Sequence, residues 1–146
     1  IYTSLAEIVN QADQASGGED GYSLLPVFHG NKTSDRTAIV SHSIDGSFAI
    51  REGNWKLCLC YGSGGWSVPK EKVAKAEKLP PLQLYDLSKD VAETTNIAEK
   101  HPAKVVHLLR LLDDIVQKGR STPGEALSND REVTFLPKGV TLPEKN

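Results

Sequence analysis

The chain has 146 residues, enough for one domain with a real core, and carries a formal net charge of −2. Hydrophobic residues make up 38% of it and aromatic residues 6%. This composition gives no electrostatic basis for binding nucleic acid or an anionic membrane, and no aromatic platform for stacking bases. No apolar run approaches the ~20 residues of a membrane-spanning helix. Residue 1 is Ile rather than Met, so we expect the natural start to lie upstream, and the missing signal peptide identifies no compartment.

The first 36 residues are expected to form short helices and loops. Apolar residues at helical spacing predict a helix in residues 1–10, with Ser4 or Thr3 as its N-cap. Residues 22–30 are apolar but contain Pro26, which favours a single helical turn. Residues 31–33 match a glycosylation acceptor, a pattern that is frequent by chance.

Residues 41–60 are the part of the chain around which the rest is organised. Asp45-Gly46 and Gly53-Asn54 each predict a two-residue hairpin turn, because both positions of such a turn tolerate positive φ. These turns define strands at 37–43, 47–52 and 55–60.

The strand period of two separates the side chains of this hairpin cleanly. In the register set by Gly53-Asn54, one face is apolar and is expected to point inward. That face holds Phe48, Ile50, Leu57 and Leu59, with Trp55 beside them. The opposite face holds Ala49, Arg51, Lys56, Cys58 and Cys60. Arg51 and Lys56 would then be like charges directly opposite each other, which requires a solvated face or a neighbouring acidic group.

The two cysteines lie two residues apart on one predicted strand, with Cα atoms about 6.5–7 Å apart. This separation is at or beyond the usual range for a disulfide, so we expect two small free thiols. A metal site would need His or Asp ligands from elsewhere in the chain.

The second half of the chain supplies one more strand and a long helix. After a Gly-rich, charged excursion, the alternation of residues 82–87 predicts the fourth strand. Asp90, Glu93 and Asn96 follow at intervals of three, which favours turn and cap chemistry over a ligand site. The 102–118 segment has Pro at its first position, an apolar stripe and Gly119 after its end, all typical of a helix. Residues 133–136 could add an edge strand.

The predicted fold class is therefore α+β. We expect a small antiparallel sheet of about four strands packed against one long C-terminal helix, with a short N-terminal helix. The contact between the helix stripe and the apolar strand face would dominate stability, at about 1.5–3 kcal/mol for each large aliphatic side chain buried.

No nucleophile or metal motif stands alone in this sequence. CxxC, HExxH and GxSxG are all absent. His42, flanked by Ser41 and Ser43, is either a polar strand residue or a contact to a bound substrate.

Four segments in order resemble the C-terminal region of arylsulfatase-type sulfatases of the alkaline-phosphatase-like superfamily. The first is TSLAEIVN (3–10) followed by DGYSLLPVFHG (20–30), which resembles the end of the large catalytic domain. SHSIDGSFAIREGNWKL (41–57) resembles the hairpin of the C-terminal subdomain. LQLYDLSKDVAETTNIAEKHP (82–102) and GRSTPG (119–124) resemble later family segments. Together they span nearly the whole chain.

The resemblance implies a chemistry that this chain does not carry by itself. Sulfatases of this family hydrolyse sulfate esters with a formylglycine made from Cys or Ser in a C/S-x-P-x-R motif, assisted by a bound calcium ion. Cys58 is followed by Leu59 and Cys60, with no Pro or Arg in place. We therefore expect no catalytic and no metal-binding residues in this chain. Formylglycine and calcium would belong to an N-terminal catalytic domain upstream of Ile1.

The resemblance also implies how the chain is organised. Residues 1–36 would close the catalytic domain, and 37–146 would form the C-terminal subdomain, which completes the fold and flanks the substrate pocket. If residues here contact a sulfated carbohydrate or aryl sulfate substrate, we expect His42 and Ser43 first, then Arg51 and Trp66. The family implies a secreted or periplasmic protein.

An alternative is a free-standing, non-catalytic binding or interaction module with the same subdomain fold. A sulfatase fragment should expose apolar residues toward the missing domain, whereas a free module should have a polar surface there. The residues that test this difference are Ile1, Leu5, Leu24, Leu25 and Phe28.

Overall fold

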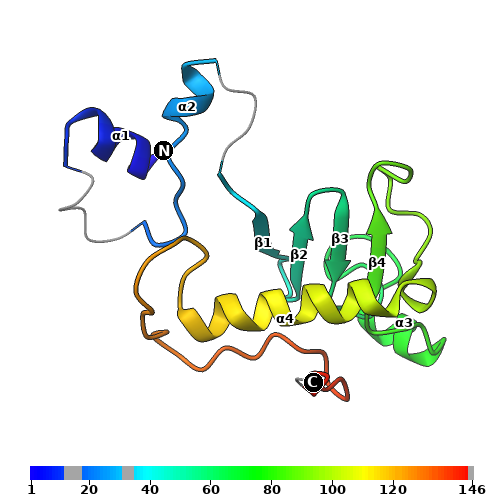
Figure 1. Ribbon diagram of the computed structural model, residues 1–146. Coiled ribbons are helices and arrows are strands. Elements are labelled where there is room, and N and C mark those ends of the chain that lie inside the picture. The colour runs from blue at the N-terminus through cyan, green and yellow to red at the C-terminus, as the bar shows by residue number, and fades with distance from the viewer. Residues whose placement is uncertain (12–17, 31–34, 145–146) are drawn as a thin grey trace. The chain divides into compact units, whose positions relative to one another are not determined.

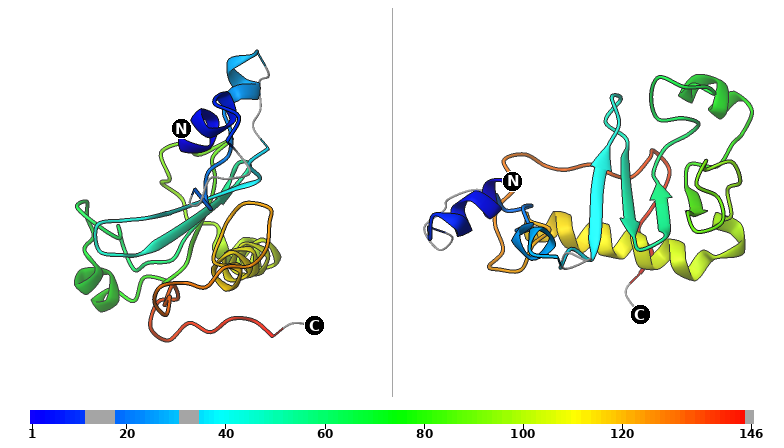
Figure 2. Two further views of the ribbon diagram at one scale, coloured as in Figure 1. Left: turned by 90° about the vertical axis from the view of Figure 1, so that its left-hand side faces the viewer. Right: turned by 90° about the horizontal axis from the view of Figure 1, so that it is seen from above.

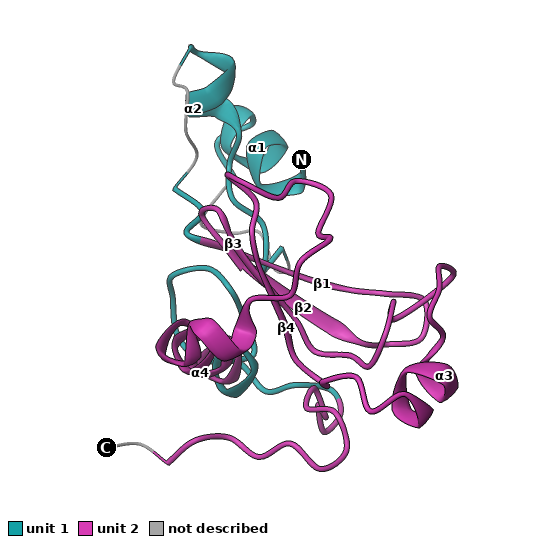
Figure 3. Ribbon diagram, turned by 90° about the vertical axis from the view of Figure 1, so that its right-hand side faces the viewer, with its two compact units in different colours: residues 1–37, 115–130 teal, residues 38–114, 131–146 magenta. Residues whose placement is uncertain are grey.

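The computed structural model describes residues 1–11, 18–30 and 35–144. The chain divides into two compact units, shown in Figure 3. The first comprises Ile1–Thr37 with Ile115–Asp130, and the second comprises Ala38–Asp114 with Arg131–Asn146. The possible glycosylation acceptor at 31–33 lies outside the described residues.

The first unit contains two short helices, α1 (Tyr2–Ile8) and α2 (Leu25–Phe28). Both were predicted, but the N-cap of α1 was not predicted correctly. Ile1 occupies the cap position and no side chain caps the helix. The Ser4 hydroxyl is buried and instead accepts a hydrogen bond of 2.8 Å from the Leu24 backbone N–H. Ser4 therefore joins α1 to the segment that enters α2.

The second unit is built on a four-stranded antiparallel sheet in the order β1-β2-β3-β4, visible in Figure 1. Its strands are β1 (Ala38–His42), β2 (Phe48–Glu52), β3 (Trp55–Cys58) and β4 (Gln83–Asp86). Its helices are α3 (Glu71–Ala76), the 3-10 turn η2 (Ala98–Lys100) and α4 (Pro102–Lys118), whose last residues belong to the first unit. The predicted α+β class and the predicted bounds of the long helix are confirmed.

The two hairpin turns differ in length. Gly53 and Asn54 form the predicted two-residue loop, because Glu52 pairs with Trp55 and Gly53 has a φ of +56°. The Asp45-Gly46 turn was predicted one residue too short. Gly46 donates its backbone N–H to the Ser43 carbonyl, and Ser43 donates its own N–H to the Ser47 carbonyl. The loop is therefore a three-residue turn that ends on Gly46 in the left-handed region, a common alternative to the two-residue turn.

The apolar face of the sheet forms the core with α4. Ile50, Leu57 and Leu84 are completely buried and share this face by register. Figures 1 and 2 show α4 lying across the strands. The helix contributes Val105, Leu108, Leu109 and Leu112 as its buried residues.

Polar contacts at the rim of this core fix which face of the sheet α4 covers. Glu52 lies opposite Trp55 on the core face, and its carboxylate accepts a hydrogen bond of 2.8 Å from His107 Nε2. The Trp55 ring packs edge-on against His101, with 5.2 Å between ring centroids. The opposite face of the sheet therefore faces away from α4.

Two expectations for the irregular segments were wrong. The excursion after β3 contains α3, which the charged run did not suggest. Its buried Ala74 and its Glu71–Lys75 ion pair explain why it forms. Residues 133–136 form no strand, although Phe135 is buried and packs edge-on against Phe48, at 6.5 Å between centroids.

Candidate functional site

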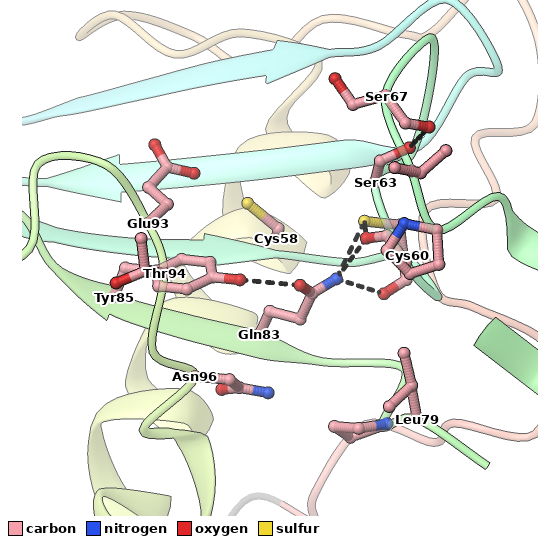
Figure 4. A pocket seen from close by; sticks show the side chains of 14 residues that line it. Cys58, Cys60, Ser63, Ser67, Leu79, Gln83, Tyr85, Glu93, Thr94 and Asn96 are labelled. Carbon is pink, nitrogen blue, oxygen red and sulfur yellow. Dashed lines mark hydrogen bonds between the residues drawn. The ribbon is translucent and has the colours of Figure 1, made fainter. Parts of the chain in front are cut away.

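A hollow lies over the face of the sheet that points away from α4. Its larger part has a volume of about 580 Å³ and its smaller part about 220 Å³. The two parts share Cys58, Cys60, Ser63 and Glu93, so they form one continuous depression, which we call the sheet trough. Figure 4 shows its side chains in front of β3 and β4, between the loop that follows β3 and the loop that follows β4.

An ion pair lines the sheet trough, with Glu93 in both of its parts and Lys56 in the smaller one. Lys56 Nζ lies 2.7 and 2.8 Å from the two carboxylate oxygens of Glu93. Both side chains are half-buried. Arg51 lies directly opposite Lys56 in the sheet register, as predicted, and Glu93 is the acidic group that this arrangement requires. The Glu93 side chain therefore binds another side chain, in place of the turn or cap contact that the sequence predicts for it.

A hydrogen-bonded network forms the floor of the larger part of the trough. Tyr85 donates its hydroxyl to Gln83 Oε1 at 2.7 Å. Gln83 Nε2 in turn donates to the carbonyl oxygens of Cys60 at 2.9 Å and Gly62 at 2.7 Å. Gly62 has a φ of +69°, and a Cβ there would lie 2.3 Å from the Pro69 carbonyl oxygen. The network therefore fixes the start of the loop that forms one wall.

The two thiols and the Tyr85 hydroxyl in the trough are held in their neutral forms. Burial raises the pKa of the Cys58 thiol to about 12 and that of the Tyr85 hydroxyl to about 12. Burial also raises the pKa of Cys60. Both cysteines are free thiols, as the strand spacing predicted. Neither thiol is therefore ionised as a nucleophile near neutral pH.

The loop after β4 is fixed by the capping contacts that the sequence predicted for Asp90 and Asn96. The Asp90 carboxylate accepts hydrogen bonds from the backbone N–H groups of Thr94 and Thr95, at 2.8–3.0 Å. Asn96 Oδ1 accepts from the N–H groups of Leu84 and Ala98, both at 3.0 Å. These contacts position Glu93 and Thr94 at the wall of the trough.

The four predicted substrate contacts lie in different places. Ser43 and His42 both border the smaller part of the sheet trough, but the register pairs His42 with Phe48, which puts the His42 side chain on the core face, where the two ring centroids lie 6.0 Å apart. Arg51 is exposed and donates from Nε to the Gly53 carbonyl at 2.8 Å, and Trp66 is 81% exposed on the loop after β3. Neither Arg51 nor Trp66 is among the described residues that line the trough.

Sequence reasoning did not identify how the lining of the trough comes together. Lys56 and Cys58 come from β3 and Gln83 and Tyr85 from β4, which pair in the sheet, and the loop after β4 adds Glu93. The paired positive charges at Arg51 and Lys56 were the one signal that an acidic partner was needed. Nothing in the sequence showed that this partner would be Glu93.

Within the described residues, no group of three or more His, Cys, Asp or Glu side chains could hold a metal ion. The described helices also include none that is long and apolar enough to cross a membrane.

Comparisons with known proteins find sulfatases that are similar to this chain. No family model matches it. It is 29% identical over 115 residues to N-acetylgalactosamine-6-O-sulfatase of Bacteroides thetaiotaomicron, covering 79% of this chain and 22% of that protein. It is 32% identical over 84 residues to choline-sulfatase of Rhizobium meliloti, covering 55% of this chain and 13% of the relative.

A solved structure gives the same result. It comes from work on the metabolism of multiple glycosaminoglycans by Bacteroides thetaiotaomicron, and it matches with a TM-score of 0.58 at 28% identity. The match covers 79% of this chain and 24% of that one.

The chain is a sulfatase homologue. It matches the C-terminal region of these proteins, in agreement with the resemblance of the four sequence segments. This sulfatase homologue spans between an eighth and a quarter of the length of the proteins it matches.

Proposed function

We propose that the chain is the C-terminal part of a sulfatase that hydrolyses sulfate esters, with a sulfated carbohydrate as the first candidate substrate and an aryl sulfate as the second. The observation that carries the proposal is the unequal coverage of the match with N-acetylgalactosamine-6-O-sulfatase. Four fifths of this chain aligns with about a fifth of that protein. The sequence also lacks the C/S-x-P-x-R motif in which the family's formylglycine is made.

In this proposal the chain itself is non-catalytic and completes the fold beside the substrate pocket. Its partner is the catalytic domain of the same protein, which would carry the formylglycine and the calcium ion. The described residues do not fit the calcium site, because they contain no cluster of acidic ligands. We therefore assign no step through the metal to this chain.

Exposed apolar side chains in the first unit support a partner domain. Ile1 is 82%, Leu5 56% and Phe28 68% exposed, and Leu24 and Leu25 are partly exposed. A free-standing module would be expected to cover such residues or replace them with polar ones. Their exposure favours the sulfatase fragment over the binding module.

Substrate contacts in this proposal come from His42 and Ser43, and then from Arg51 and Trp66. The position of Ser43 in the trough supports its assignment, whereas the side chain of His42 lies beside Phe48 on the core face of the sheet. In the complete protein, a His or Arg side chain would hydrogen-bond a sugar hydroxyl or an anionic group of the substrate. If His42→Ala in the complete protein leaves KM and kcat unchanged, this assignment is wrong.

Sulfate release tests the function as a whole. The complete protein from the open reading frame and the 146-residue chain alone would each be incubated with N-acetylgalactosamine 6-sulfate, choline sulfate and p-nitrophenyl sulfate. We expect the complete protein to release sulfate from at least one ester and the chain alone to release none. Sulfate release by the chain alone, or an open reading frame without C/S-x-P-x-R upstream of Ile1, would refute the proposal. The proposal also places the protein in a secreted or periplasmic compartment, which cell fractionation tests.

A further inference from the structure

The sheet trough has the size and the position of a binding site. Its larger part, about 580 Å³, lies within the range of about 300–1,000 Å³ that is typical of small-molecule pockets. Its floor is β3 and β4, which are closed from behind by the buried core. Its walls are the loop after β3, which the Gln83 network fixes, and the loop after β4, which Asp90 and Asn96 fix.

The charge in the trough is balanced, which excludes a bare sulfate as the favoured ligand. Lys56 is the one Lys or Arg among the described lining residues, and Glu93 neutralises it through both carboxylate oxygens. His42 also borders the smaller part, but its side chain lies on the core face beside Phe48. A sulfate group is bound best by unpaired Arg, Lys or converging N–H donors, which this lining lacks.

The chemistry of the lining fits a ring with hydroxyl groups at its edge. Hydroxyl side chains surround the trough and alternate with apolar surface. The hydroxyl residues are Ser63, Ser67, Thr94 and Tyr85, and the apolar ones are Val68, Pro69 and Leu79. Lys56 can donate and Glu93 can accept, so the ion pair offers both partners that a sugar hydroxyl uses. The apolar side chains can cover the C–H face of the same ring.

We propose that the sheet trough binds an uncharged sugar unit of the substrate, next to the unit that bears the sulfate, with Lys56 and Glu93 hydrogen-bonding its hydroxyl groups. The inference rests on the proposed function, because it takes the bound sugar to be part of the substrate of a sulfatase. The smaller part of the trough, which Ser43 lines, is continuous with this site.

A titration followed by NMR tests the site directly. The ¹⁵N-labelled chain would be titrated with N-acetylgalactosamine and, at equal ionic strength, with sodium sulfate. We expect saturable shifts of the amides at 56–63 and 83–96 with the sugar alone. These shifts should be the same in about 50 and about 300 mM NaCl, because a neutral ligand is not screened. No saturation below about 50 mM sugar, shifts confined to other residues, or equal shifts with sulfate would each overturn the proposal.

Two variants and one control locate the ligand. Glu93→Gln removes the charge but keeps the shape, and should weaken sugar binding at least about fivefold. Ser67→Tyr fills the larger part of the trough from its exposed rim and should abolish binding without touching the ion pair. Glu71→Gln removes an equivalent acid from the exposed α3 pair and should change nothing. If Glu93→Gln does not fold, Ser67→Tyr serves as the test by itself. If the Ser67→Tyr variant still binds the sugar, the proposed site is wrong.

Kinetics of the complete protein separate this proposal from the proposed function. In Glu93→Gln, KM should rise for a sulfated disaccharide and stay unchanged for p-nitrophenyl sulfate, which has no second sugar. If the wild type hydrolyses both esters but the variant changes neither KM, the trough proposal fails alone. If the wild type hydrolyses neither ester, the proposed function fails, and the titration still decides whether the trough binds sugar.

Discussion

Lys56 and Glu93 are 37 residues apart in sequence, yet the Lys56 ammonium lies within 2.8 Å of both carboxylate oxygens of Glu93. The ion pair connects the middle of β3 to the loop after β4. It also lies beside Arg51, a like charge directly opposite Lys56. Glu93 adopts a φ of +55°, which a residue with a Cβ rarely takes. The ion pair is one interaction that favours this conformation.

We predict that Glu93→Gln lowers the free energy of unfolding by about 1 kcal/mol, because the half-buried Lys56 keeps its charge but loses its partner. Urea denaturation measures the change. Gln has a Cβ like Glu and meets the same steric constraint at this positive φ. The measured loss of stability therefore reports the Lys56–Glu93 ion pair. In the double variant Lys56→Met with Glu93→Gln, we expect less destabilisation than the sum of the single changes. Strict additivity would show that the two side chains do not interact in solution.

Among the polar residues of the loop after β4, we expect substitution of Asn96 to lower the free energy of unfolding most. Its side chain accepts from the Leu84 and Ala98 N–H groups and donates to the Leu82 carbonyl, each at 3.0 Å. Leu84 is in the buried strand β4, so its N–H has no other partner if Asn96 is truncated. We predict that Asn96→Ala lowers the free energy of unfolding by about 2–3 kcal/mol, measured from the urea midpoint.

Asn96→Asp is the matched control for that change. It keeps the accepting oxygen but loses the donated hydrogen bond to Leu82, so we expect a smaller loss than for Ala. Equal losses in the two variants would contradict the role of Oδ1 in holding β4.

How much of this fold follows from sequence depends on the range of the interactions. The Gly53-Asn54 turn, the alternation of Ile50 and Leu57, and the helix 102–118 were predictable because each depends on neighbours a few residues away. The helix α3 was not, since its buried Ala74 looks like any alanine in a charged run. Its helical state depends on the packing of that alanine.

Of the two residues singled out first from the family resemblance, Ser43 lines the trough, whereas the side chain of His42 lies beside Phe48 on the core face. Their role as substrate contacts stays a prediction. The Lys56–Glu93 pair depends on the pairing of β3 with β4 and on a loop conformation with positive φ, neither of which a local pattern encodes. For Cys58, the strand period did place it on the face away from the core. It could not show that a loop would close over that face.

The contact between α4 and the sheet should dominate the stability of the second unit. Leu108 and Leu112 are completely buried on the helix. We predict that Leu108→Ala and Leu112→Ala each lower the free energy of unfolding by about 2–5 kcal/mol, because each leaves a cavity beside the strands. Thermal and urea denaturation would measure both. Val91→Ala removes an apolar side chain that is 81% exposed and should cost less than about 0.5 kcal/mol. A loss below about 1 kcal/mol for both leucines would mean that α4 does not cover the sheet.

Asp90 predicts a dependence of stability on acid. The hydrogen bonds from Thr94 and Thr95 to its carboxylate lower its pKa below the ordinary value of 3.8. Because the folded pKa is the lower one, this stabilisation is present above pH 3.8 and is lost as the pH falls through the folded value. We expect Asp90→Asn to be less stable than the wild type at pH 7, with the difference shrinking as the pH falls below 3.8. Urea midpoints across this range would show it, and a difference independent of pH would contradict it.

Cys58 predicts the opposite dependence, at alkaline pH. Burial raises the pKa of its thiol from 9.0 to about 12, so the unfolded chain loses this proton first. Between pH 9 and 12 the unfolded state therefore binds fewer protons than the folded state, and stability falls as the pH rises. Cys58→Ser should flatten this fall, and the effect is clearest beside Tyr85→Phe, which removes the other group with a pKa near 12. Iodoacetamide gives a second measurement: at pH 9 we expect the folded chain to be alkylated far more slowly than the chain in urea, since only the thiolate reacts. Equal rates in the two states would show that the Cys58 thiol is neither buried nor held neutral in the trough.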